Sequence, residues 1–323
     1  MKAITQTAYG SPDVLRLEEV DKPVPQDDEV LVRVQAASIN AGDWHLMRGT
    51  PFLVRLMFGG VLKPAIVTLG ADMAGRVEAV GQNVTQFQPG DAVFGDLSNN
   101  GFGAFAEYVC VPAAILASKP ANLTFEQAAT VPTAAVTALQ ALRNLGQLQP
   151  GQRVLVNGAS GGVGSFAVQI AKAWGAEVTG VCSPQKMAMV RAIGSDRVID
   201  YTQTDWTQTE QPYDLIIDAA AYQPFWNALS ALTPEGTYVM VGGSTAGFFQ
   251  SVLFGSWLTK LNRRTVKFLT MTPSLQDLNV VRDLLAAGKI TPYLDRCYPL
   301  SEVPTAIHHV EQRQVQGKVA ISV

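Results

Sequence analysis

Residues 153–174 read RVLVNGASGGVGSFAVQIAKAW and join a strand, a glycine-rich turn and a helix without an interruption. The opening run RVLVN has the composition of a buried strand, and the apolar residues after the glycines recur at helical spacing. Between the two segments, Ala159, Gly161 and Gly164 fit A-x-G-x-x-G, the dinucleotide fingerprint with alanine at its first position. The stretch therefore predicts an α/β fold that binds a dinucleotide where this helix begins.

A turn this tight requires residues that tolerate unusual backbone angles, and a pyrophosphate approaches helix N–H groups only where Cβ atoms are absent. We therefore expect the whole turn to contact the cofactor: Gly158, Ala159, Ser160, Gly161, Gly162, Val163 and Gly164. The alternative is a glycine-rich turn that is packed for its own sake.

The composition of the chain bounds what it can be. With 323 residues, of which 47% are hydrophobic, the chain is long enough for about two domains with a large core. Its net charge of -3 argues against a nucleic-acid partner or an anionic membrane partner. The three cysteines lie far apart, which favours neither a disulfide framework nor a cysteine metal cluster. No signal segment precedes the first strand, so we expect a cytoplasmic protein whose mature chain starts at Met1.

The order of predicted elements divides the chain in two. Short strand-like runs separated by turn residues predict a β-rich domain, with strands at 3–7, 14–19, 29–38, 75–80, 92–95 and 106–111. A helix at 124–145 follows, with Thr124 as its N-cap. Strands at 153–157, 177–182, 197–200, 213–219, 236–241 and 266–271 then alternate with helices at 184–193, 222–232 and 275–287, which predicts a doubly wound parallel sheet. A helix at 303–311 and a strand at 318–323 are expected to return to the first domain.

The end of the second strand of the parallel sheet indicates which nicotinamide cofactor binds. An acidic residue there binds the ribose 2′-hydroxyl of NADH, but no Asp or Glu occurs from residue 178 to residue 195. Ser183 and Lys186 stand there instead, and Tyr201 closes the third strand. A hydroxyl, an ammonium group and a phenol suit a 2′-phosphate, so we expect NADPH. A solvated helix residue is the alternative for Lys186, and a cap on the core is the alternative for Tyr201.

Four further stretches, together with the fingerprint, carry a resemblance to a known family. They are SINAGDW at 38–44, LGADMAG at 69–75, FQPGDAV at 87–93 and GKV at 317–319. In order and spacing the chain resembles the medium-chain dehydrogenase/reductase superfamily, and within it the zinc-free quinone oxidoreductases and enone reductases, including plastid-envelope quinone oxidoreductase homologues. The resemblance implies a GroES-like β-rich domain, 1–122 with 288–323, and a Rossmann cofactor domain, 123–287. It also implies a site in the cleft between them and a homodimer.

The chain departs from the zinc alcohol dehydrogenases of this superfamily at the metal positions. Asn40 stands where they have a Cys ligand, Ala71-Asp72 where they have His-Glu, and Pro132 near the other Cys position. Since zinc prefers several Cys or His ligands, we expect no metal. Asp43 and His45 form an alternative metal pair, but a lone His beside an Asp is more typical of a surface or packing residue. Without a Lewis acid, alcohol oxidation is disfavoured.

The resemblance also implies roles for individual residues. It places the candidate catalytic residues Asn40 and Thr133 beside the nicotinamide and its ribose. Asp43 orients Asn40 or the ribose, or only caps a turn. The resemblance implies that the cofactor is contacted further by Ala219, Gly242, Gly243 and Met271, with Lys318 joining the 2′-phosphate group. The expected reaction transfers hydride from NADPH to a quinone or to the C=C bond of an α,β-unsaturated ketone, where hydrogen-bond donors stabilise the developing enolate oxygen. The sequence shows no clear proton donor.

Two apolar stretches, 51–62 and 248–258, are expected to border the mouth of the cleft. They either line a channel for an apolar enone or contact a membrane. The alternative is that they are buried between the two domains or between the subunits of a dimer. The uncharged stretch 237–259 has the length of a membrane span, but its glycines favour a strand followed by a helix.

Two alternative functions remain open at this point, and a third is disfavoured. Gly158 to Gly162 also match G-x-S-x-G, the nucleophile elbow of hydrolases, with Asp218 and His308 downstream in hydrolase order. A short-chain dehydrogenase is disfavoured, because no Tyr is followed four residues later by Lys. A non-catalytic NADPH-binding sensor or structural protein is the alternative from a different class.

Overall fold

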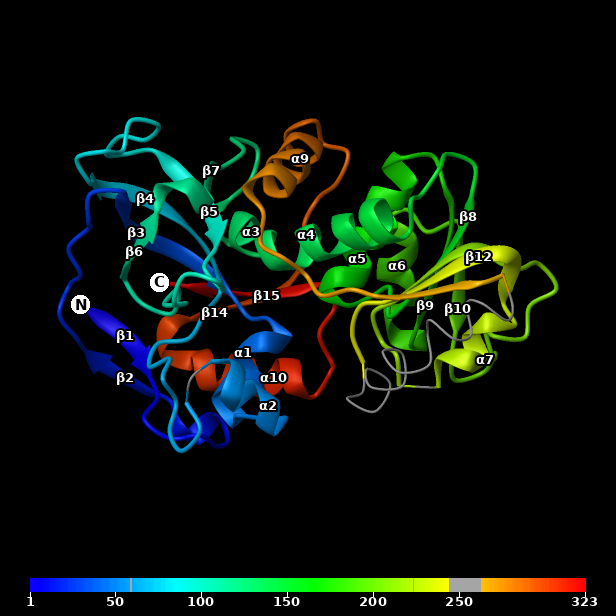
Figure 1. Cartoon of the computed structure of the whole chain (residues 1–323), viewed down its shortest axis with the longest axis horizontal. Helices are drawn as coiled ribbons and strands as arrows, with labels where there is room; N and C mark the ends of the chain where they lie inside the picture. Colours follow the sequence, from blue (N-terminus) through cyan, green and yellow to red (C-terminus); the bar gives the residue numbers. More distant parts are fainter. Residues whose placement is uncertain (59, 223, 244–262) are drawn as a thin grey trace. The chain divides into compact units, whose positions relative to one another are not determined.

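A computed structural model of the chain describes residues 1–58, 60–222, 224–243 and 263–323. The chain forms two compact units (Figure 1). Unit 1 comprises Met1–Thr133, Pro273–Ala286 and Leu294–Val323, and unit 2 comprises Ala134–Thr272 and Ala287–Tyr293. The predicted fold class, a β-rich domain with a parallel α/β domain, is confirmed, whereas the predicted domain boundaries stay a prediction. Over the described ranges, the helices are too short or too polar to cross a membrane.

Unit 2 is built on a parallel sheet. Its described strands are β8 (Arg153–Asn157), β9 (Glu177–Cys182), β10 (Arg197–Asp200), β11 (Tyr213–Asp218), β12 (Leu232–Met240) and β13 (Thr265–Phe268). They lie in the order β10-β9-β8-β11-β12-β13, and every neighbouring pair is parallel. This is the 3-2-1-4-5-6 order of a dinucleotide-binding sheet, in which the order of strand addition reverses between β8 and β11. A ligand of such a sheet binds at the carboxyl ends of the strands beside that reversal.

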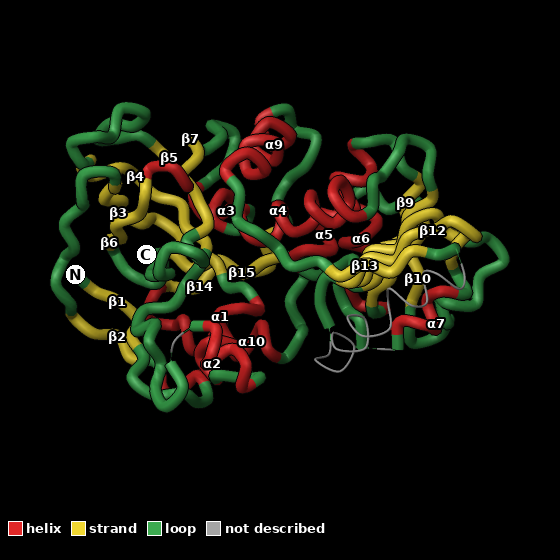
Figure 2. The backbone as a smooth tube through the Cα atoms, viewed as in Figure 1, coloured by secondary structure: helices red, strands yellow, loops and turns green. Residues whose placement is uncertain are grey.

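Helices cover this sheet (Figure 2). They are α4 (Pro132–Gln140) with the π-turn η3 (Ala141–Leu145), α5 (Gly162–Ala173), η4 (Pro184–Lys186), α6 (Met187–Ala192) and α7 (Phe225–Leu229). Helix α5 packs on β8 and β9, α6 packs on β9 and β10, and α7 packs on β12. The single helix predicted at 124–145 is wrong: the chain forms α3 (Phe125–Ala129) and then α4, because Pro132 disfavours helical geometry at the residue before it. The helix predicted at 222–232 is also too long, since β12 already begins at Leu232.

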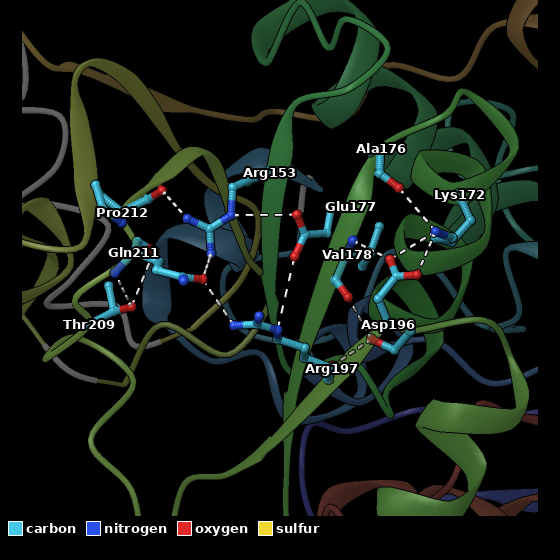
Figure 3. Close-up of polar contacts among 11 residues, drawn as sticks. Arg153, Lys172, Ala176, Glu177, Val178, Asp196, Arg197, Thr209, Gln211 and Pro212 are labelled. Carbon is cyan, nitrogen blue, oxygen red and sulfur yellow. Dashed lines mark hydrogen bonds and ion pairs between the residues drawn. The ribbon is translucent and has the colours of Figure 1, made fainter.

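A polar network fixes the amino ends of β8 and β9 (Figure 3). The carboxylate of Glu177 lies 3.7 Å from the guanidinium group of Arg153 and 3.9 Å from that of Arg197. Both guanidinium groups also donate to the side-chain oxygen of Gln211, at 3.2 and 3.1 Å. Such partly exposed ion pairs contribute at most about 1 kcal/mol each. Their effect is to tie the strands together at the edge opposite to the glycine turn.

Unit 1 is built on a mixed sheet with the order β14-β15-β3-β4-β5-β7, in which β6 also pairs with β3. Its described strands are β3 (Glu29–Ser38), β4 (Asp72–Val80), β5 (Ala92–Asp96), β6 (Tyr108–Pro112), β7 (Leu116–Ser118), β14 (Leu294–Pro299) and β15 (Lys318–Ser322), beside a hairpin of β1 (Lys2–Thr5) and β2 (Arg16–Glu19). Its helices are η1 (Pro12–Val14), α1 (Ala41–Arg48), α2 (Phe52–Met57), η2 (Ala113–Ile115), α3, α9 (Leu275–Ala286), η5 (Leu300–Glu302) and α10 (Val303–Glu311).

The last strand of the chain completes the sheet of the first domain, as predicted. β15 lies antiparallel to β3, with Ala320 opposite Ser38. The inner face of β3 is buried through Val30, Val32 and Val34 in the core of unit 1. Helix α1, which follows β3, is tied to α10 by a bidentate ion pair between Arg48 and Glu311, at 2.5 and 2.9 Å. The end of β3 is therefore positioned by segments from both ends of the chain.

The glycine turn requires one of its glycines for packing. A Cβ atom on Gly164 would lie 2.1 Å from the carbonyl oxygen of Gly158, whereas one on Gly161 would lie 3.4 Å from the same oxygen. Gly158 itself has φ +78°, in the left-handed region that favours glycine. Gly164 thus lets α5 begin directly against the turn, and Gly161 leaves space in front of the helix.

We expect Gly164→Ala to lower the free energy of unfolding by roughly 1–3 kcal/mol, because the new methyl group overlaps the backbone of the turn. Gly161→Ala, the matched control, changes it by less than about 1 kcal/mol, because a Cβ atom fits there. Urea denaturation followed by circular dichroism measures both. Equal losses in the two variants would contradict the packing described for Gly164.

Candidate active site

The glycine turn lies at the carboxyl end of β8. The N–H groups of Gly158 and Ala159 donate to the carbonyl oxygen of Val181 on β9, at 3.1 and 3.0 Å, and the N–H of Gly161 donates to Gly158 at 3.0 Å. Ala159 is buried, with its Cβ atom against Gly180, so the alanine at the first fingerprint position fits the space between β8 and β9. The turn therefore directs the start of α5 to the edge of the sheet where the strand order reverses.

The residues of this turn fit a pyrophosphate. Ser160 and Gly164 are buried, while Gly158, Gly161, Gly162 and Val163 are half-buried. The first N–H groups of a helix lack intrahelical acceptors and carry the positive end of the helix dipole. No Cβ atom projects from Gly161 or Gly162, so an anion can reach these N–H groups.

Three predicted cofactor residues meet at the carboxyl ends of β9 and β10. Asp200 of β10 lies opposite Cys182 of β9, and the N–H of Tyr201 donates to the Cys182 carbonyl oxygen at 3.3 Å. Ser183 begins a turn in which its carbonyl oxygen accepts from the N–H of Lys186 at 3.0 Å. The Tyr201 side chain is 57% exposed. The structure therefore brings Ser183, Lys186 and Tyr201 to one edge of the sheet.

The charges at this edge have both signs. Burial and the charge of Asp200 raise the pKa of the Cys182 thiol to about 11, although Lys186 and Arg191 oppose this shift. The sequence pattern did not indicate Arg191, which lies on α6, five residues after Lys186. Asp200 is engaged by the hydroxyl of Thr202 at 2.8 Å.

The remaining predicted cofactor residues of unit 2 follow β11, β12 and β13. The N–H of Ala219 donates to the Asn157 carbonyl oxygen at 3.0 Å, and the Gly242 carbonyl oxygen accepts from Ala221 at 3.0 Å. A Cβ atom on Gly243 would lie 2.3 Å from the Ala221 carbonyl oxygen, so only glycine fits. Met271 comes after the end of β13 and is half-buried. Ala219 thus follows β11, which flanks the reversal of strand order, and Gly242 follows β12, the next strand of the sheet.

Asp218 supports the backbone at this edge. Its buried carboxylate accepts hydrogen bonds from Tyr238 at 2.7 Å, Asn157 at 2.8 Å and the N–H of Ala220 at 3.1 Å. His308, the other residue of the hydrolase alternative, contacts Gln312 at 2.7 Å. Asp218 is therefore engaged by its own sheet, which gives the hydrolase alternative no support.

In unit 1, a buried lysine holds Asn40. The ammonium group of Lys318 donates to the carbonyl oxygen of Ile39 at 2.9 Å and to the side-chain oxygen of Asn40 at 2.5 Å. The amide nitrogen of Asn40 donates to Asp72 at 2.9 Å, and Lys318 itself lies 3.8 Å from the same carboxylate. Both ends of the Asn40 amide are therefore engaged, which fixes its orientation.

Asp72 also connects Asn40 to Thr133. The backbone N–H and the hydroxyl of Thr133 donate to one Asp72 oxygen, at 3.0 and 2.6 Å, while the other oxygen accepts from Ser38 at 3.2 Å. The Thr133 hydroxyl lies 3.3 Å from Asp96. Asn40 and Thr133, the two residues predicted to flank the nicotinamide, thus share one buried carboxylate. The sequence pattern noted Asp72 only as a departure from zinc enzymes and did not indicate Asp96, because four strands bring these residues together.

Asp43 positions the backbone around Asn40. Its buried carboxylate accepts from the N–H of Asn40 at 2.7 Å and from the N–H of Gly70 at 3.2 Å. Of the roles considered for Asp43, these contacts support the orientation of Asn40 and the capping of α1. Its expected part in catalysis stays a prediction.

The network is short of positive charge. Burial, together with the charge of Asp72, raises the pKa of Asp43 to about 7 and that of Asp96 to about 6. Burial also lowers the pKa of Lys318, although Asp72, Asp43 and Asp96 oppose this shift. Near neutral pH, protons are therefore exchangeable within this site.

Lys318 is placed differently from the expected 2′-phosphate contact. Its side chain is 4% exposed, and its ammonium group is bound by unit 1. The geometry does not favour the phosphate contact, which stays a prediction. Of the apolar stretches, 248–258 lies outside the described residues, whereas 51–62 includes α2 with exposed side chains. The exposed apolar residues of this stretch are Phe52, Leu53, Leu56, Met57, Phe58, Val61 and Leu62.

The side chains at the zinc positions of related dehydrogenases make other contacts. Asn40 and Asp72 bind Lys318, and His45 contacts the carbonyl oxygen of Thr50 at 2.7 Å. Over the described ranges, no three His, Cys, Asp or Glu side chains are grouped so that they could hold a metal ion. The prediction of a metal-independent site is not tested by that observation.

Two family models match the chain. Residues 26–121 match the alcohol dehydrogenase GroES-like domain, and residues 193–321 match a family described as zinc-binding dehydrogenase.

Similar proteins span almost the whole chain. It is 34% identical to the NAD(P)H oxidoreductase RTN4IP1, mitochondrial, of Bos taurus, over 98% of this chain and 87% of the relative. It is 32% identical to the 2-methylene-furan-3-one reductase of Solanum lycopersicum, over 99% and 79%. It is 30% identical to the chloroplast envelope quinone oxidoreductase homolog of Arabidopsis thaliana, over 99% and 98%. The quinone oxidoreductase from Coxiella burnetii has a similar structure, with a TM-score of 0.87, 29% identity and coverage of 100% of this chain and 99% of that one.

The raised pKa of Asp43 makes the stability of the protein depend on pH. A carboxyl group with a raised pKa binds its proton more tightly in the folded state, so its stabilising effect is lost as pH rises from about 4 through about 7. Relative to Asp43→Asn, the wild-type free energy of unfolding should fall over this range by about 1.4 kcal/mol for each unit of pKa shift. Urea denaturation at several pH values measures it. The exposed control Asp21→Asn should keep the wild-type pH dependence, and an identical dependence in Asp43→Asn would contradict the raised pKa.

Proposed function

This chain belongs to the quinone oxidoreductase family of the medium-chain dehydrogenase/reductase superfamily, and on that premise we propose that it is an NADPH-dependent, metal-independent reductase of apolar quinones or α,β-unsaturated ketones. At the coarser level, it is an NAD(P)H-dependent oxidoreductase of the quinone or enone type. The preference for NADPH, the independence of metal and the apolar acceptor are the proposed parts.

The observation that carries the proposal is the glycine turn where the strand order reverses. Gly161 and Gly162, which have no side chain, leave the N-terminus of α5 open to a pyrophosphate, and a Cβ atom at Gly164 would overlap the carbonyl oxygen of Gly158. A nicotinamide cofactor supplies a hydride when it is bound. The protein's own contribution is to bind the cofactor and to stabilise charge on the acceptor.

The preference for NADPH is supported by the edge formed by β9 and β10. Ser183, Lys186 and Tyr201 supply a hydroxyl, an ammonium group and an exposed phenol at the position where NADH-specific folds have a carboxylate. A 2′-phosphate gains charge-assisted hydrogen bonds from such groups. The carboxylate of Asp200, which is nearby, binds Thr202.

The proposed acceptor chemistry is supported by the Asn40 and Thr133 side chains. Asn40 uses one amide hydrogen on Asp72 and keeps a second one, which can be donated to an oxygen that gains negative charge. Lys318 supplies a fixed positive charge beside the Asn40 amide. Asn40 stands where zinc alcohol dehydrogenases have a Cys ligand, so this positive charge lies beside that position. The exposed apolar side chains of α2 support an apolar acceptor. A homodimer and a cytoplasmic location remain predictions.

The experiment that tests the proposal follows the absorbance of NADPH and NADH with quinones and with short- and long-chain enones as acceptors. We expect NADPH to be oxidised with at least one acceptor class and with higher kcat/KM than NADH. The kcat/KM for long-chain enones should exceed that for short-chain enones. If NADPH binds but no acceptor oxidises it, the protein is a non-catalytic NADPH-binding protein instead.

The same assay tests the role of Lys186. Loss of a charge-assisted hydrogen bond costs about 1.5–3 kcal/mol, so Lys186→Met should lower kcat/KM for NADPH roughly 10- to 100-fold. The value for NADH should change little, because NADH lacks the 2′-phosphate. Lys289→Met removes an exposed lysine of the same unit and is the matched control. Equal losses with NADPH and NADH would contradict the 2′-phosphate contact.

A further inference from the structure

Two buried aspartates face each other across neighbouring strands of unit 1. Asp72 is the first residue of β4 and Asp96 is the last residue of β5, and the two lie directly opposite in the antiparallel register. Their side chains are buried, with Asp72 fully enclosed and Asp96 7% exposed. Two ionised carboxylates at directly opposite positions repel each other, and burial strengthens this repulsion. The arrangement is most stable when one of the two carries a proton.

The donors around Asp72 identify it as the ionised member. One of its oxygens accepts two hydrogen bonds from Thr133, and the other accepts from Ser38 and from Asn40. Lys318 adds a positive charge 3.8 Å away. Hydrogen bonds and an opposite charge favour the ionised form of a carboxyl group. Asp72 is therefore the fixed anion of this site.

The donors around Asp96 leave room for a proton. One of its oxygens accepts from the N–H of Ser98 at 2.8 Å, and the other lies 3.3 Å from the Thr133 hydroxyl. That hydroxyl has one hydrogen, and its shorter contact, 2.6 Å to Asp72, takes it. The longer contact is then satisfied when Asp96 carries the hydrogen and donates to the Thr133 oxygen. Burial and the charge of Asp72 raise the pKa of Asp96 to about 6, although hydrogen bonds from the backbone and side chain of Ser98 and from Thr133 oppose this shift.

We propose that Asp96 is the proton source of the site and that it acts through the Thr133 hydroxyl. This inference rests on the proposed function and supplies the proton donor that the sequence does not show. Asp96 is a positioning and relay residue, since Thr133, and not Asp96, is proposed to deliver the proton to the acceptor. Among the described residues, the charged groups that face this pair are Lys318 on β15 and Asp43 on α1, which interacts with Asp72 and Lys318.

The transfer balances with one hydride and one proton. Hydride from NADPH adds to the β-carbon of an enone and leaves an enolate. The Thr133 hydroxyl turns its hydrogen from Asp72 to the enolate, and the Thr133 O–H bond breaks as this proton moves to the enolate. The Asp96 O–H bond then breaks as its proton moves to the Thr133 oxygen. Asp96 is left as a carboxylate. Because 7% of its surface is exposed, it can regain a proton from solvent. The products are the saturated ketone and NADP⁺.

The test compares wild type with Asp96→Asn, which keeps an oxygen for the Ser98 N–H but carries no acidic proton. With an enone, general acid catalysis contributes about 10²-fold or more, so kcat should fall by that factor at pH 6. Wild-type kcat with the enone should decline above about pH 6, and this decline should be absent in Asp96→Asn. The Kd of NADPH and the rate with a quinone should change little, because the oxygens of a reduced quinone take protons from water. Asp96→Glu should restore part of the enone rate, and the exposed control Asp283→Asn should behave as wild type.

A second measurement does not depend on turnover. Infrared difference spectra between pH 5 and pH 8 should show a carboxyl group titrating near pH 6 in wild type and missing in Asp96→Asn. If kcat with the enone and its pH profile are the same in Asp96→Asn, or if Asp96 titrates at an ordinary value, the relay is overturned and the proposed function stands. If wild type reduces neither enone nor quinone, the proposed function and the delivery step both fail. The infrared titration then still decides whether Asp96 holds the proton.

Discussion

The buried ion pair of Lys318 and Asp72 is the interaction on which the site in unit 1 depends. Burying an ammonium group costs several kcal/mol unless hydrogen bonds and an opposite charge replace its water. The replacements are the Ile39 carbonyl oxygen, the Asn40 amide and the Asp72 carboxylate. Because Lys318 begins the last strand of the chain and Asn40 follows β3, the site is complete only when both ends of the chain have joined one sheet.

Unit 2 prepares its part of the function in a different way. There the backbone forms the proposed binding site: Gly158 supplies a left-handed turn, and Gly164 lets α5 begin directly against this turn. Few side chains are needed to bind a pyrophosphate, since helix N–H groups and the helix dipole suffice. The residues that we propose discriminate between cofactors follow the next strands, with Ser183 after β9 and Tyr201 after β10. One unit thus depends on buried charge and the other on the absence of side chains.

This difference explains how much the sequence could predict. The strand, turn and helix at 153–174 were predictable because local periodicity and glycine spacing report them directly, and the family motifs added the β-rich domain. The contacts of Asp72, Asp96, Thr133 and Lys318 were not predictable, because four strands and α4 bring together residues far apart in the chain. For the same reason, Lys318 was expected at a phosphate and not beside Asn40. The helix at 124–145 failed at Pro132, a signal that the sequence did contain.

The central claim is that Lys318 and Asp72 stabilise unit 1 as a pair, and a double-mutant cycle tests it most directly. Free energies of unfolding would be measured for wild type, Lys318→Met, Asp72→Asn and the double variant. Each single change leaves a buried charge without its partner, so each should cost about 3–5 kcal/mol. The double variant should cost clearly less than the sum, with a coupling energy above about 1 kcal/mol. Additive losses, within about 0.5 kcal/mol, would contradict the account.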